Sequence, residues 1–104
     1  MGQKDQATKL SRDEAKRKIA LFLKEGRVRP TSHCLRDSMP KRNVSLQDIL
    51  HVLQHGEVIR DAQWDEEHGE WKYVMEGADL EGDDLRAVTV FFDAAMTLII
   101  VTVF

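Results

Sequence analysis

Apolar residues in two segments of the chain recur every three or four positions, which is the spacing of one face of an α-helix. Each segment opens on a serine, Ser11 or Ser45, that is followed three positions later by an acidic residue, as in a capping box. A glycine follows each segment, as is common just beyond the end of a helix. The pattern therefore predicts helices over residues 11–25 and 45–55.

A shorter helix is expected between these two, over residues 32–39. Cys34 and Leu35 would be its buried residues, and Pro40 would end it, because proline lacks the N–H that a helix interior requires. The residues before it, 27–30, carry two arginines and a proline and are interpreted as a basic connector.

After Gly56 the period of the pattern changes from helical to strand-like, with short polar connections between the apolar runs. Strands are predicted over residues 57–64, 70–77, 85–92 and 96–104. Short connections favour an antiparallel meander. Helices followed by strands predict an α+β domain over residues 11–104, in which the helices pack on one face of a four-stranded antiparallel sheet and residues 1–10 form a flexible polar tail.

Charge is distributed unevenly along the chain. Residues 1–44 carry 12 Lys and Arg against 5 Asp and Glu, whereas residues 45–104 carry 3 against 13. A basic half attracts polyanions, so RNA is expected to bind on the N-terminal side. The alternative is that these charges are simply the solvated faces of helices.

The single cysteine, Cys34, excludes an internal disulfide and fits a reducing compartment, and no apolar run is long enough to span a membrane. A cytoplasmic protein of bacterial type without membrane attachment is the expectation. His51 and His55 have a spacing that suits a metal, and His68 or Cys34 offers a further ligand, but no CxxC or HExxH motif accompanies them. No metal and no cofactor is therefore expected.

The chain resembles a bacterial family known as domain-of-unknown-function family 4258. The similar positions are Ser32-His33, Arg42-x-Val44-Ser45-x-x-Asp48-Ile49, Leu53-x-x-Gly56-Glu57-Val58-Ile59, Tyr73-Val74-Met75-Glu76-Gly77 and Ile100-Val101-Thr102-Val103-Phe104. The resemblance covers about residues 31 to 104. It implies a helices-then-sheet domain near the RelE-like toxins and barnase-type ribonucleases, and it suggests RNA as a substrate. The chain departs from the family where Pro40 interrupts a helix that is usually continuous, which bears on the placement of Arg42.

Metal-independent RNA cleavage needs a base for a 2′-hydroxyl, an acid for the leaving oxygen and cations that hold the charge on phosphorus. Histidine suits proton transfer near neutral pH, and the guanidinium fork suits phosphate oxygens. His33, Arg42 and Lys72 are therefore the candidate catalytic residues, the first two from the family pattern and Lys72 as the only lysine among the strands. Tyr73 and Thr102 are the candidate substrate-binding residues.

Each candidate also has a structural interpretation. His33 has Asp37 four residues on, within reach of its ring. Arg42 has many acidic side chains in the strands with which to pair, and Lys72 is interpretable as an exposed strand residue. Tyr73 and Thr102 are more often packing residues in such strands.

Two hypotheses about function follow from these observations. The first is a toxin-type endoribonuclease, and the second is a non-catalytic module of the same fold that binds RNA or an acidic protein. An antitoxin or a second copy of the chain is a further candidate partner, because a four-stranded meander leaves strand edges open. Trp64 and Trp71 are expected to face each other across the first hairpin, either as packing or as a base-stacking platform.

Overall fold

A computed structural model describes residues 8–104, so most of the expected polar tail, residues 1–7, lies outside the described residues. Leu10, at the end of that tail, is half-buried and donates its backbone N–H to the Tyr73 hydroxyl at 2.9 Å. The packed part of the chain therefore begins at least one residue earlier than the first capping serine.

Both predicted capping boxes are present, and each starts a helix. In α1 (Arg12–Glu25) the Ser11 hydroxyl accepts the Glu14 N–H at 3.1 Å, and the Glu14 carboxylate accepts the Ser11 N–H at 2.9 Å. Ser45 begins α3 (Leu46–His55) through the same reciprocal exchange with the residue three positions on. These two helices are confirmed as predicted, because hydrogen bonds between near neighbours set where they begin.

The middle helix runs further than predicted, and the expectation that Pro40 would end it is wrong. A π-helical turn, η1 (Cys34–Ser38), leads directly into α2 (Met39–Arg42). Pro40 lies in the first turn of α2, where its missing N–H costs little and its fixed φ suits the helix. The segment ends instead at Asn43, whose φ of 54° is in the left-handed region. Arg42 is therefore held on a helix.

Within residues 8–104, six strands form one mixed sheet in the order β1-β6-β5-β4-β2, and β3 pairs with another part of β4. The strands are β1 (Arg27–Pro30), β2 (Glu57–Val58), β3 (Gln63–Asp65), β4 (Glu70–Ala78), β5 (Asp84–Phe92) and β6 (Thr97–Val103), with a 3₁₀ turn, η2 (Asp93–Ala95), before β6. Strands β4, β5 and β6 form the antiparallel meander predicted from the sequence.

The prediction of four antiparallel strands is wrong in two places. The expected connector is strand β1, which pairs in parallel with β6. A four-residue strand that ends in proline has no clear period of its own, so its conformation depends on the partner strand. The strand predicted over residues 57–64 is divided into β2 and β3, which pair with opposite ends of β4.

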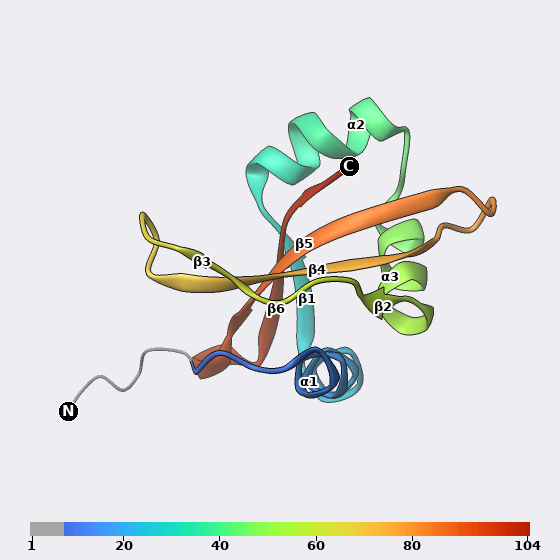
Figure 1. The fold of residues 1–104 in the computed structure, drawn as a ribbon. Helices are drawn as coiled ribbons and strands as arrows, with labels where there is room; N and C mark the ends of the chain where they lie inside the picture. The colour runs from blue at the N-terminus through green and yellow to red at the C-terminus, as the bar shows by residue number, and fades with distance from the viewer. Residues whose placement is uncertain (1–7) are drawn as a thin grey trace.

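All of the helices contribute to one hydrophobic core, so they lie against the same face of the sheet. The core residues of the strands alternate along β4, β5 and β6, as Tyr73 and Met75 do on β4. Figure 1 shows η1 and α2 beside the C-terminal end of β6, α1 at the other end of β1 and β6, and α3 along β4 and β5. Leu35 is an exception to the prediction, since it is 53% exposed.

Trp64 and Trp71 are paired across the β3–β4 hairpin, with ring centroids 5.0 Å apart in an edge-to-face arrangement. Trp71 packs against the hydrophobic core, whereas Trp64 is 44% exposed. The expected contact is confirmed, and it holds together the hairpin that carries Lys72.

Candidate nucleic-acid interface

The face of the sheet opposite the hydrophobic core, called here the second face, is formed by the alternate strand positions that the core does not use. Its residues are Arg27 and Arg29 of β1, Thr97, Ile99 and Thr102 of β6, Phe104 just beyond it, Asp84, Arg86, Val88, Val90 and Phe92 of β5, and Glu70, Lys72, Val74 and Glu76 of β4. Strand register orders these side chains in rows across the sheet. The second face therefore has arginines and aromatic rings around a buried middle, in which Val74 and Val90 are 3% and 4% exposed.

Arg27 and Arg29 lie along the outer edge of this face. Arg27 is level with Thr97, and Arg29 is level with Ile99, so both side chains project from the same side of β1. Both are exposed, and among residues 8–104 neither has an ion-pair partner. Phe92 of β5, which is separated from β1 by β6, is 47% exposed and level with Thr97. Two unneutralised guanidinium groups thus lie in neighbouring rows, near an exposed ring.

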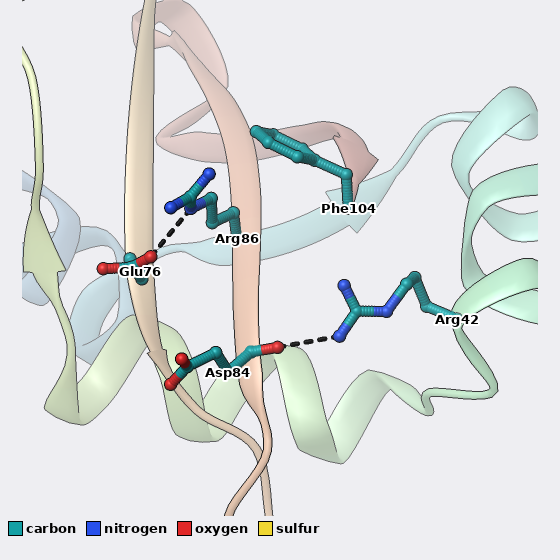
Figure 2. Close-up of a pocket in the computed structure, with 5 residues that line it drawn as sticks. All are labelled: Arg42, Glu76, Asp84, Arg86 and Phe104. Carbon is teal, nitrogen blue, oxygen red and sulfur yellow. Dashed lines mark hydrogen bonds and ion pairs between the residues drawn. The ribbon is translucent and has the colours of Figure 1, made fainter.

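Arg42 reaches the other end of the second face. One of its Nη atoms donates to the backbone carbonyl of Asp84 at 2.7 Å, and Arg42 lines a hollow with Glu76, Arg86 and Phe104 (Figure 2). The guanidinium is therefore bound by a neutral carbonyl, not by one of the acidic side chains. Its positive charge remains available to a ligand.

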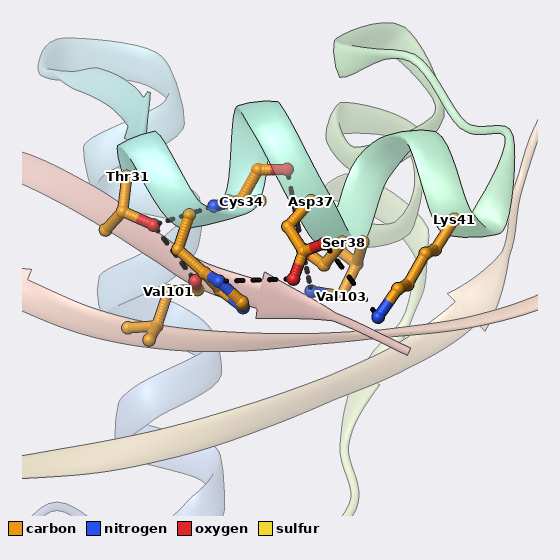
Figure 3. A network of polar contacts seen from close by, with 8 residues as sticks. Thr31, Cys34, Asp37, Ser38, Lys41, Val101 and Val103 are labelled. Atoms are coloured by element: carbon orange, nitrogen blue, oxygen red, sulfur yellow. Dashed lines mark hydrogen bonds and ion pairs between the residues drawn. The ribbon is translucent and has the colours of Figure 1, made fainter.

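His33 lies just before η1, with 57% of its side chain exposed. Its Nδ1 is 3.6 Å from a carboxylate oxygen of Asp37, one turn further along. The second oxygen of Asp37 is 3.8 Å from the ammonium of Lys41 (Figure 3), so Asp37 lies between two basic side chains, each four residues away along the chain. The expected contact with Asp37 is present, and the imidazole is accessible to solvent.

The segment that carries His33 is tied to the edge of β6 by two hydroxyl groups (Figure 3). β1 ends at Pro30, and beyond it the Thr31 hydroxyl donates to the Val101 carbonyl at 3.0 Å. Further along, the Ser38 hydroxyl accepts the Val103 N–H at 3.2 Å. These bonds continue the hydrogen bonding of the strand edge where β1 no longer covers it, and they fix η1 beside the sheet.

Lys72 is engaged by the hairpin to which it belongs. Its ammonium is 2.9 Å from a carboxylate oxygen of Asp65, and Nδ1 of His68 is 2.8 Å from the same oxygen. Hydrogen bonds from Lys72 and then from His68 hold the pKa of Asp65 well below its usual range. The bond to Asp65 raises the pKa of His68. This network accounts for the position of Lys72 as part of the β3–β4 hairpin.

The two candidate substrate-binding residues have different surroundings. Tyr73 is 2% exposed and contacts Phe91, and its hydroxyl accepts the N–H of Leu10. Burial raises the pKa of this phenol. Thr102 is half-buried on the second face, level with Val88. Tyr73 is thus placed as a core residue, whereas Thr102 lies on the face that carries the arginines.

The three candidate catalytic residues do not line one hollow. Arg42 contacts Asp84 at the start of β5, whereas Lys72 lies one residue beyond the Tyr73–Thr89 pair, which is itself five residues along the same strand. At about 3.4 Å per residue, this separates them by roughly 20 Å. Neither His33 nor Lys72 lines the hollow that contains Arg42. The structure brings Arg42 together instead with Arg86 and Phe104, neither of which is among the candidate residues predicted from the sequence.

The possible metal ligands are dispersed. Cys34 is fully buried, and burial raises the pKa of its thiol. Asp65, His68 and Glu70 have ligand atoms within 4.8 Å of one another, but Asp65 is already bound by the lysine described above. The rings of His51 and His55 are tilted by 50° with their centroids 4.7 Å apart, and Nδ1 of His51 is 2.8 Å from the Ala78 carbonyl oxygen. This surface pair offers two nitrogen ligands at most, fewer than a structural zinc site requires.

Among the described residues, no helix has the length and apolar character needed to cross a membrane.

Neither the curated proteins nor the solved structures contain a match to this chain. The sequence model of a family described as a domain of unknown function, DUF4258, matches residues 31–104. The match includes η1, α2, α3 and strands β2 to β6, and it begins just after the end of β1. The chain therefore belongs to the DUF4258 family.

Proposed function

We propose that this domain binds single-stranded RNA across the second face of its sheet. The observation that carries the proposal is the pair Arg27 and Arg29, which project side by side from the edge strand without acidic partners among residues 8–104. Guanidinium groups in this arrangement attract successive phosphates of a nucleic acid backbone and release its counterions.

The remainder of the second face supports a single-stranded ligand in particular. Phe92 and Phe104 are 47% and 44% exposed, and exposed rings on a sheet stack unpaired bases. Glu76 is neutralised by Arg86, with an Nε to Oε2 distance of 2.7 Å. Asp65 is likewise paired with Lys72 at one end of β4. Glu70 and Asp84, at further positions of this face, have no ion-pair partner among residues 8–104, so free negative charge remains near the ends of β4 and β5, away from Arg27 and Arg29.

Salt dependence provides the test. Fluorescence anisotropy of a labelled 12-nucleotide RNA of mixed sequence is measured with the unmodified chain and with R27Q/R29Q over a series of salt concentrations. Each lost phosphate contact lowers the slope of log K against log salt by about 0.7 for a single strand, so the double variant is expected to lose about 1.4. R17Q/K24Q, which removes two exposed charges from α1, is the matched control. An affinity that does not depend on salt, or equal losses in the two double variants, would contradict the proposal.

A second candidate function is metal-independent RNA cleavage with His33 as the acid or base. One observation favours it, because the imidazole of His33 is exposed and its Nδ1 lies 3.6 Å from a carboxylate oxygen of Asp37. A carboxylate near a histidine is common where that histidine transfers protons.

Cleavage is tested with an end-labelled RNA in the presence of a chelator. H33A is expected to remove the activity, whereas H55A, which alters an exposed histidine on another helix, is expected to retain it. Equal cleavage by all three proteins, or none by any of them, would exclude His33 as a catalytic residue. RNA binding through Arg27 and Arg29 does not depend on that result.

A further inference from the structure

The hollow beside Arg42 has a volume of about 190 Å³ and lies where three separate parts of the chain meet. Arg42 comes from the end of α2, Glu76 and Arg86 from paired positions on β4 and β5, and Phe104 from beyond β6 (Figure 2). Arg86 and Phe104 are joined by two backbone hydrogen bonds of 3.0 Å each. The walls of the hollow are thus attached to the central strands of the sheet.

The hydrogen bonds of the two arginines leave most of their donors unused. Arg42 donates to the Asp84 carbonyl at 2.7 Å, and Nε of Arg86 donates to Glu76 at 2.7 Å. Among the described residues these are the only hydrogen bonds of either guanidinium, and each group has five N–H donors. In Figure 2 the carboxylate of Asp84 points away from Arg42. The remaining donors of both groups are therefore free for a ligand.

Charge limits the type of anion that fits. Arg42 and Arg86 contribute two positive charges, Glu76 is paired with Arg86, and the carboxylate of Asp84, the second acidic residue of the lining, points away from Arg42 (Figure 2). Among the described residues, Arg42 is therefore the one cation of the lining without an acidic partner, and a single guanidinium is balanced by a phosphodiester, which carries one negative charge, better than by a phosphate monoester, which carries nearly two at neutral pH. A backbone phosphate of RNA meets this requirement.

The ring of Phe104 provides a second contact. It is 44% exposed, and its centroid is 5.7 Å from the guanidinium carbon of Arg86. A base attached to the bound phosphate can therefore stack on the ring or on the planar guanidinium beside it. The hollow offers both a phosphate contact and a stacking surface within one small volume.

From these contacts we infer that the hollow is a subsite for one phosphodiester of RNA, held between Arg42 and Arg86 with an adjoining base on Phe104. The inference rests on the proposed RNA binding. It places one phosphodiester and its neighbouring base at a defined position on the second face. Arg27 and Arg29 then hold other phosphates of the same strand.

Arginine side-chain NMR with a dinucleoside monophosphate tests the subsite directly. Adenylyl-adenosine is titrated into the full chain labelled with ¹⁵N, and the Nε signals of Arg42 and Arg86 are expected to shift. R42Q and R86Q are each expected to weaken binding at least about tenfold, since each removes a charged hydrogen-bond donor. F104L is expected to weaken it less, and R17Q, on α1, is expected to leave it unchanged.

Two comparisons complete the test. Adenosine monophosphate and inorganic phosphate are titrated in the same way, and binding of either that equals or exceeds that of the diester would overturn the assignment to a phosphodiester. Thermal melting of R42Q and R86Q identifies a variant that loses its fold, and the other variant then decides the outcome. Diester affinity that is unchanged in the folded variants overturns the subsite.

Failure of this inference is distinguishable from failure of the proposed function. If RNA binds through Arg27 and Arg29 but the dinucleotide leaves the signals of Arg42 and Arg86 unmoved, only the subsite is wrong. If the 12-nucleotide RNA does not bind but the dinucleotide shifts those signals, the proposal for the whole second face is wrong and the subsite is an isolated anion site.

Discussion

The hydroxyl of Ser38 supports two parts of the fold at once, and its removal is expected to destabilise the protein. Ser38 is 7% exposed, and its Oγ accepts the Val103 N–H at 3.2 Å and donates to the Cys34 carbonyl at 3.4 Å (Figure 3). Ser38→Ala removes the acceptor from a buried strand N–H. The variant therefore tests whether η1 secures the edge of β6.

The magnitude follows from the group left without a partner. A buried donor deprived of its acceptor costs about 1–3 kcal/mol in the free energy of unfolding. For a domain of this size each kcal/mol lowers Tm by about 4–8 °C, so the expected loss is easily measured by thermal and urea unfolding. Hydrogen exchange gives the local readout, because the Val103 amide is expected to lose protection.

Ser32→Ala is the control, since it removes an exposed hydroxyl from the start of the same segment. It is expected to leave both the stability and the exchange of Val103 close to those of the unmodified protein. The reasoning would be refuted if Ser38→Ala changed the free energy of unfolding by less than about 0.3 kcal/mol, well under the cost expected for an unsatisfied buried group, and Val103 stayed protected.

Three further predictions concern single residues. The thiol of Cys34 is buried and its pKa is raised, so a thiol reagent is expected to label it only as fast as the protein opens, and faster in urea. In an NMR titration His68 is expected to show a pKa above its usual range of about 6.5, and Asp65→Asn is expected to lower it. Because that pKa is raised in the folded state, the bond between His68 and Asp65 stabilises the hairpin fully below about pH 6.5 and is lost as the pH rises through the raised pKa. Gly56→Ala is expected to reduce stability by about 1–3 kcal/mol in urea unfolding, because an added Cβ would lie 2.3 Å from the backbone oxygen of Glu76.

Each of these expectations has a clear contrary result. Rapid labelling of Cys34 in the native protein would show that the core around it is open. If Asp65→Asn leaves the pKa of His68 unchanged, the two side chains are not in contact in solution. A stability of Gly56→Ala equal to that of the unmodified protein would mean that β2 and β4 shift apart without cost.

Much of the fold follows from local patterns in the sequence. The capping exchanges at Ser11 and Ser45 involve residues three positions apart, so the starts of α1 and α3 are predictable. The long apolar strands β4, β5 and β6 alternate clearly and follow one another through short turns. The short connection between β3 and β4 likewise brings Trp64 opposite Trp71.

Other features depend on partners that are distant in sequence. β1 has four residues and no alternation of its own, and it becomes a strand because β6, about 70 residues later, offers a free edge. The path through Pro40 depends on the π-helical turn before it, which the hydroxyl of Ser38 holds against the same edge. Neither interaction is visible in the local sequence.

For the candidate site, the sequence by itself determined the residue types, the excess of basic residues before residue 45 and the contact between His33 and Asp37 one helical turn apart. Only the tertiary structure decided that Arg42 meets Arg86 and Phe104, while Lys72 is engaged by Asp65 on a distant hairpin. The physical reason is that helical and strand periods are set by neighbouring residues, whereas the packing of α2 against the ends of β5 and β6 sets which distant charges share a surface.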